Sequence, residues 1–106
     1  MQAHTLTKRP QDNRNIMSDN KQETPFFEIA DQFIDLANKL AQTEGSANVG
    51  TALRYAAARY NTFEASLSTK DLAKDEAQII DMLCDDFREM LKVNMQDYIQ
   101  RLAKKD

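Results

Sequence analysis

Residues 49–67 read VGTALRYAAARYNTFEASL, and their apolar positions repeat at intervals of four and three residues. This spacing is typical of one face of an α-helix and is close to the heptad pattern of helices that pack side by side. Three consecutive alanines at the centre leave the backbone bare, so that another helix can approach closely. The sequence therefore predicts an all-α fold. The apolar face consists of Val49, Leu53, Ala56, Tyr60, Phe63 and Leu67.

The composition favours few, long helices. The chain has 106 residues, enough for one domain. It contains only two glycines and two prolines, the residues that most often mark turns. Many short strands would need more turn residues than this. We therefore expect residues 24–106 to form one small antiparallel bundle of three or four helices.

The N-terminal residues differ in character from the rest. Residues 1–23 are polar with scattered apolar side chains, and they cannot bury enough surface to offset the entropy lost on ordering. We expect them to form a disordered tail. Residues 17–21 read MSDNK, which would serve as a start of translation, so we expect residues 1–16 to be an upstream extension.

The first two helices are expected at residues 25–43 and 47–66. Gly45 is the expected residue after the first helix, because glycine adopts a left-handed conformation without steric cost. Ser46 is expected to cap the second helix. The aromatic residues on the helical faces are expected in the core: Phe26, Phe27, Phe33, Tyr60, Phe63 and Phe87.

The third helical pattern is too long for a compact bundle. A straight helix over residues 71–104 would span about 51 Å, whereas a domain of this size is about 30 Å across. A break is expected at Asn94, which can cap a new turn together with Asp97. This would give helices at 71–93 and 94–104. The alternative is one long helix whose overhang packs on a partner chain.

The end of this pattern carries the candidate interface. Met95, Tyr98, Ile99 and Leu102 continue the apolar face beyond what a compact bundle can cover. Left in water, they would form an apolar patch of a kind that monomers seldom tolerate. We expect a non-enzymatic protein-interaction module that self-associates as a homodimer through these residues.

The ordered domain lacks the residues that most enzymes use. The only histidine, His4, lies in the tail, which excludes Ser-His-Asp and Cys-His catalysis and Cys/His zinc sites in the domain. Rows of carboxylates on one helical face, such as Asp81 and Asp85, are interpreted as solvated acidic faces, because their spacing does not match that of a calcium-binding loop. We expect no enzymatic activity, no cofactor and no bound metal.

Charge and hydropathy limit the partners. The net charge is −3 and no basic stripe occurs, which argues against nucleic acid. No apolar run approaches the roughly 18 residues of a membrane span. The single cysteine, Cys84, excludes an intramolecular disulfide and favours a reducing compartment, so the cytoplasm is the expected location.

A polar cluster in the second helix suggests an alternative function. Tyr55, Arg59 and Asn61 lie around the alanine run. An arginine can bind an anion through two parallel hydrogen bonds, and tyrosine and asparagine add further donors. The alternative hypothesis is therefore a small-ligand or anion-binding helical domain that uses these three residues.

Several segments together carry a family resemblance. They read FEIADQFIDL at 27–36, YAAARYNTF at 55–63 and DYI at 97–99. They resemble a family of short helical bacterial proteins, found mainly in proteobacteria, with no assigned activity. The resemblance covers about residues 26–100. It implies one small all-α domain and assigns no catalytic residue.

Overall fold

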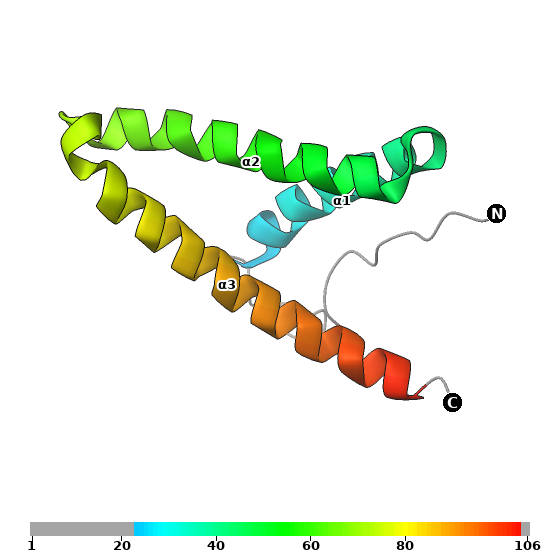
Figure 1. Cartoon of the computed structure of the whole chain (residues 1–106). Coiled ribbons are helices and arrows are strands. Elements are labelled where there is room, and N and C mark those ends of the chain that lie inside the picture. The colour runs from blue at the N-terminus through cyan, green and yellow to red at the C-terminus, as the bar shows by residue number, and fades with distance from the viewer. Residues whose placement is uncertain (1–22, 105–106) are drawn as a thin grey trace. The chain divides into compact units, whose positions relative to one another are not determined.

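The computed structural model describes residues 23–104, which form three α-helices joined by two short turns (Figure 1). The helices are α1 (Glu23–Glu44), α2 (Ser46–Ser68) and α3 (Leu72–Lys104). No strand occurs in this range, so the all-α prediction is confirmed. Apart from Glu23, the tail expected at residues 1–23 lies outside the described residues, as do the expected start at Met17 and the histidine His4.

The turn between α1 and α2 is a single glycine. Gly45 has a φ of +87°, and its amide donates to the carbonyl of Ala41 at 3.1 Å, as predicted for the residue that ends a helix. The carbonyl of Gly45 already accepts from the amide of Val49 at 3.1 Å. Gly45 is therefore also the cap of α2, and the prediction that Ser46 fills this role was wrong. The amide side chain of Asn48 donates to the carbonyl of Glu44 at 3.0 Å, which satisfies one of the last acceptors of α1.

The turn between α2 and α3 is held by side-chain hydrogen bonds. The Asp71 carboxylate accepts from the amide of Lys74 at 3.1 Å and thereby caps α3. The hydroxyl of Thr69 accepts from the amide of Asp71 at 3.1 Å and donates to the Asp75 carboxylate. These bonds satisfy donors of the first turn of α3, so the short connection is well specified.

Helix α3 continues without a break through Asn94. The side chain of Asn94 donates to the carbonyl of Met90 at 2.8 Å, within the same helix. Asp97 pairs with Arg101 one turn later in the same helix. The expected break and the fourth helix at 94–104 were therefore wrong. The 33 residues of α3 span about 50 Å.

The chain divides into two units, Met1–Leu53 and Arg54–Asp106, which meet within α2. No side chain is buried among those that the structure describes in either unit. Each unit holds one helix and part of another, and two helical pieces cannot surround a side chain on all sides. The aromatic residues expected in a core are accordingly exposed or half-buried; Tyr60 is 61% exposed and Phe63 is 53% exposed.

Candidate interaction surface on α3

One face of α3 is apolar along almost the whole helix. Its positions follow one another at an average spacing of about 3.6 residues, the period of a straight α-helix. Most of them face water: the exposed fraction is 50% at Ile80, 57% at Met95 and 62% at Leu102. We call this face the α3 stripe. It consists of Ala73, Ala77, Ile80, Cys84, Phe87, Leu91, Met95, Tyr98 and Leu102.

A second apolar row lies on another side of α3. Leu72, Ile79 and Leu83 are half-buried, unlike most of their neighbours. On α2, Asn61 and Ala65 are half-buried in the turns nearest the connection to α3. The α2 residues and the α3 residues belong to the same unit, and the same short turn connects their two helices. We infer that the second row faces α2, whereas the α3 stripe does not.

The second row has no apolar member in the last third of α3. Met90 is its last apolar residue, and Asn94, Asp97 and Arg101 follow on the same side. Nearer the turn, Glu76 and Asp86 already interrupt the row. Helix α2 has 23 residues, and 23 residues of α3 counted from its start end at Asn94. However the two helices are oriented, α2 cannot reach further along α3 than this, whereas the α3 stripe continues for two more turns.

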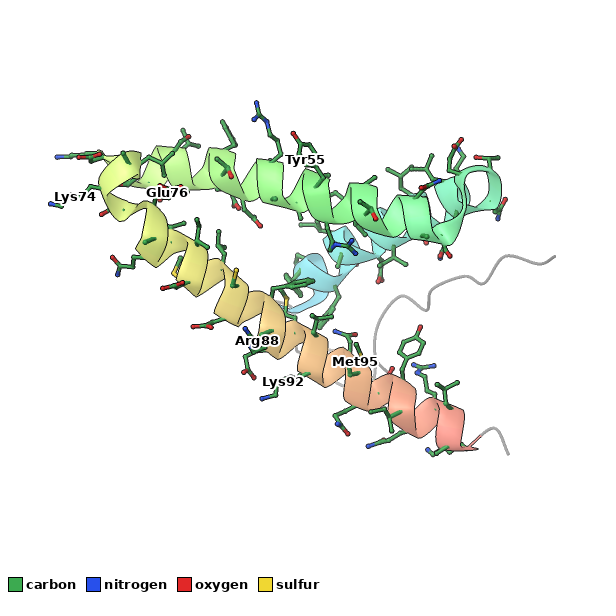
Figure 2. The ribbon with its side chains drawn as sticks, viewed as in Figure 1. Tyr55, Lys74, Glu76, Arg88, Lys92 and Met95 are labelled. Carbon is green, nitrogen blue, oxygen red and sulfur yellow. The ribbon has the colours of Figure 1, made fainter. Side chains whose placement is uncertain are left out.

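The four residues predicted as an interface lie on one side of the continuous helix. Met95, Tyr98, Ile99 and Leu102 have the i, i+3, i+4, i+7 spacing of neighbours on a helical surface. Met95, Ile99 and Leu102 are each more than half exposed (Met95 is labelled in Figure 2). Tyr98 is half-buried, and the guanidinium carbon of Arg101 lies 5.7 Å from the centre of its ring, within the range of a cation–π interaction.

Charged side chains follow one edge of the α3 stripe in a segregated order. Asp81 and Asp85 come first, and Arg88 and Lys92 follow at intervals of three and four residues. The ion pair between Lys92 Nζ and Glu89 Oε2 is 3.7 Å long and largely exposed to solvent, so it contributes little to stability. The structure gives Asp81, Asp85 and Arg88 no ion-pair partner among residues 23–104.

The predicted ligand residues do not form a common site. Tyr55 and Arg59 are one turn apart on the same side of α2, and both are exposed (Tyr55 is labelled in Figure 2). Asn61 lies two residues beyond Arg59, which places it on a nearly opposite side of the helix. There its side-chain nitrogen donates to Oε1 of Glu64 at 2.8 Å. The helix therefore separates the amide from the guanidinium.

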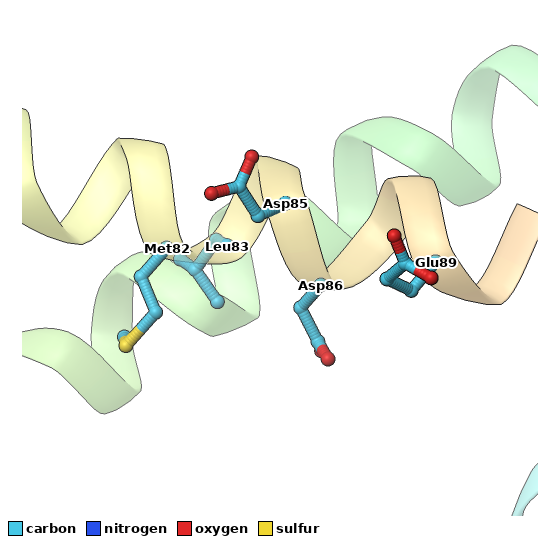
Figure 3. A pocket seen from close by; sticks show the side chains of 5 residues that line it. All are labelled: Met82, Leu83, Asp85, Asp86 and Glu89. Carbon is cyan, nitrogen blue, oxygen red and sulfur yellow. The ribbon is translucent and has the colours of Figure 1, made fainter.

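A hollow of about 450 Å³ opens on the surface of α3, lined by Met82, Leu83, Asp85, Asp86 and Glu89 (Figure 3). In the figure, Asp85 projects from one side of the ribbon, and Met82 and Asp86 project from the other. Three of the five lining residues are acidic. A negatively charged ligand would be repelled here, so the hollow does not supply the anion site that the alternative hypothesis requires.

The described residues contain neither a cluster that would hold a metal ion nor a helix that could span a membrane. Over residues 23–104, no three side chains of His, Cys, Asp or Glu come together in a way that would hold a metal ion. In the same range, none of the three helices combines the length and the apolar character needed to cross a membrane.

The interface predicted from the sequence, Met95, Tyr98, Ile99 and Leu102, covers only the C-terminal end of the apolar face of α3. Ala73 and Ala77 carry little hydrophobic signal because their side chains are small. Asp81 and Asp85 were interpreted as a solvated acidic face, and Arg88 was not considered together with them. In one continuous helix, the charged residues recur at intervals of three and four, as the apolar residues do. This common spacing indicates that the charges follow one edge of the apolar face.

Comparison with known protein families gives a match over most of the described chain. A family model described as "Protein of unknown function (DUF3144)" matches residues 26–99, from the first turn of α1 to the last part of α3. No curated protein and no solved structure was found to match. The match confirms the resemblance to a family of unknown function. The chain belongs to the family of proteins of unknown function DUF3144.

Proposed function

We propose that this protein is a non-enzymatic interaction module that self-associates through the α3 stripe. The observation that carries the proposal is the unbroken length of α3 together with the exposure of its apolar face. Helix α3 has 33 residues against 22 in α1 and 23 in α2, and the apolar face reaches Leu102.

The lengths of the helices limit what can cover this face. Measured from the turn between them, the 23 residues of α2 can extend along α3 no further than Asn94. Met95, Ile99 and Leu102 lie beyond that level, and each is more than half exposed. A contiguous apolar patch of this kind marks a protein–protein surface.

A second copy of the chain is the simplest partner. Most homo-oligomers are dimers with a two-fold axis, in which the same patch is used by both subunits. The α3 stripe is rich in Met, Phe, Tyr and Leu, which suits the apolar core of such an interface. The charged edge lies beside it, as expected for a polar rim.

Sedimentation equilibrium on the full chain tests the proposal. We expect a dimer at micromolar concentrations, and we expect Met95→Glu to shift the chain towards the monomer because it places a charge within the apolar stripe. The matched control is Gln96→Glu, which adds the same charge at the next residue, on another side of the helix. A full-length monomer at high micromolar concentration, or an equal effect of the two variants, would contradict the proposal.

A further inference from the structure

We propose that the two copies pair their α3 helices antiparallel, with the two-fold axis passing between Asp85 and Asp86. This inference rests on the proposed function, because it assigns the register of the same surface. The order of small and large side chains along the α3 stripe and the order of charges on its edge each point to this arrangement.

The first argument is the size of the side chains. The stripe begins with small residues, Ala73 and Ala77, and ends with large ones, Met95 and Tyr98. In the proposed register Ala77 lies opposite Met95 of the partner subunit, and Ala73 lies opposite Tyr98 of the partner subunit. Large side chains then fill the space that small ones leave, which close packing requires.

The middle of the stripe follows the same register. Ile80 lies opposite Leu91 of the partner subunit, and Cys84 lies opposite Phe87 of the partner subunit. The four pairs differ by at most one residue in register, so one straight antiparallel pair satisfies all of them. A parallel, in-register pair would instead set alanine against alanine and leave voids at one end.

The second argument is charge. The antiparallel register brings Asp81 within about two residues of the level of Arg88 of the partner subunit, on the same edge of the interface. Asp81 also comes within about two residues of the level of Lys92 of the partner subunit, and Asp85 within about two residues of the level of Arg88 of the partner subunit. Because the axis is two-fold, each attraction occurs twice. A parallel pair would instead place each charged residue level with its own copy, so the acids and the bases of the edge would not meet.

The isolated chain leaves this charge pattern unbalanced. Asp81 and Asp85 are four residues apart, as are Arg88 and Lys92, and like charges at this spacing destabilise a helix. Asp81, Asp85 and Arg88 have no ion-pair partner within residues 23–104. An antiparallel second copy supplies an opposite charge to both halves of the edge.

Cross-linking through Cys84, the single cysteine of the chain, tests the register directly. In the proposed dimer the two Cys84 residues lie about 4.5 Å apart along the helix axis, on facing helices about 8–10 Å apart. A short bis-maleimide cross-linker added to the full-length protein should join the two chains, and Cys84→Ser should abolish the product. If only the C-terminal ends paired, antiparallel about Tyr98, the two thiols would be about 40 Å apart and no product would form.

Charge exchange separates the antiparallel from the parallel arrangement, in which Cys84 would also cross-link. Asp81→Arg and Arg88→Asp should each weaken the dimer, roughly tenfold in Kd, because each sets like charges against each other twice. An equimolar mixture of the two variant chains should form a heterodimer with near wild-type affinity, since every charge then meets its opposite. The variant that carries both changes should also recover.

The outcomes separate this inference from the proposed function. A stable dimer that fails to cross-link, or a mixture that associates no better than either variant, overturns the register and leaves self-association standing. A monomeric full-length chain overturns both. Cross-linking together with recovery in the mixture establishes the antiparallel pairing.

Discussion

The Nε atom of Arg101 donates a hydrogen bond to Oδ2 of Asp97 at 2.7 Å, one turn apart on α3. The two side chains are 32% and 12% exposed, so this pair is better shielded from water than the accessible pair of Lys92 and Glu89. The pair lies on the same side of α3 as the second row.

The Asp97–Arg101 pair should show a measurable coupling. A double-mutant cycle with Asp97→Ala and Arg101→Ala is expected to give a coupling energy of about 0.3–1 kcal/mol, because an acid four residues before a base is the favourable order in a helix. The cycle cancels the gain in helix propensity that each alanine brings. Urea denaturation at low and high salt measures it. A coupling that does not decrease with added salt would show that the contact is not electrostatic.

The two glycines should respond to alanine with opposite signs. Gly45→Ala is expected to lower the free energy of unfolding by about 1–2 kcal/mol, because a side chain at φ +87° is strained. Gly50→Ala is expected to raise it by about 0.5–1 kcal/mol, because Gly50 lies inside α2. A Cβ atom at either position meets nothing within 4 Å, so packing does not confuse the comparison. Chemical denaturation of both variants checks it, and a change of the same sign in both would contradict it.

Leucine substitutions at two alanines should distinguish the face that the proposed dimer covers from a face that stays exposed to water. Ala77→Leu is expected to overpack the proposed dimer, where Ala77 meets Met95 of the partner subunit, at a cost of about 1–3 kcal/mol of association. Ala57→Leu in the alanine run of α2 is the control, because Ala57 is exposed and leucine is nearly as good a helix former. Sedimentation equilibrium of both variants measures the difference. If Ala77→Leu dimerises as well as Ala57→Leu, the large-against-small packing is wrong.

Arg59 should be replaceable without loss of stability. It is exposed and has no ion-pair partner among residues 23–104, so Arg59→Met is expected to change the free energy of unfolding by less than about 1 kcal/mol. Thermal melts with and without phosphate or dicarboxylates test the alternative function at the same time. A stabilisation of the unmodified protein that Arg59→Met removes would revive the anion-binding hypothesis.

Local interactions were sufficient to predict the helices. The periodicity of residues 49–67 predicted α2 to within two residues at either end, and Gly45 has the positive φ expected for the end of α1. Both depend on side chains and backbone only a few residues apart. The cap of α2 was misassigned from Ser46 because one glycine ends α1 and begins α2, and that double role cannot be read from cap preferences taken one helix at a time.

The predicted ligand cluster failed for a geometric reason. Tyr55, Arg59 and Asn61 are close in sequence, and proximity in sequence suggested a common site. Once these residues lie in one helix, a separation of two residues turns the side chain to the far side. A helical wheel drawn from the sequence would have separated Asn61 from Arg59.

The long apolar pattern of α3 was visible in the residues themselves, because helical periodicity is a local property that each turn repeats. Whether that pattern runs straight or folds back at Asn94 depends on which surfaces are present to cover it, and those come from other helices or another chain. Asn94 bonds to the carbonyl of Met90 within the helix, and the apolar face continues to Leu102. Continuity at Asn94 could not be derived from periodicity, since a capped break and an uninterrupted helix carry the same apolar spacing and differ only in the contacts made by distant surfaces.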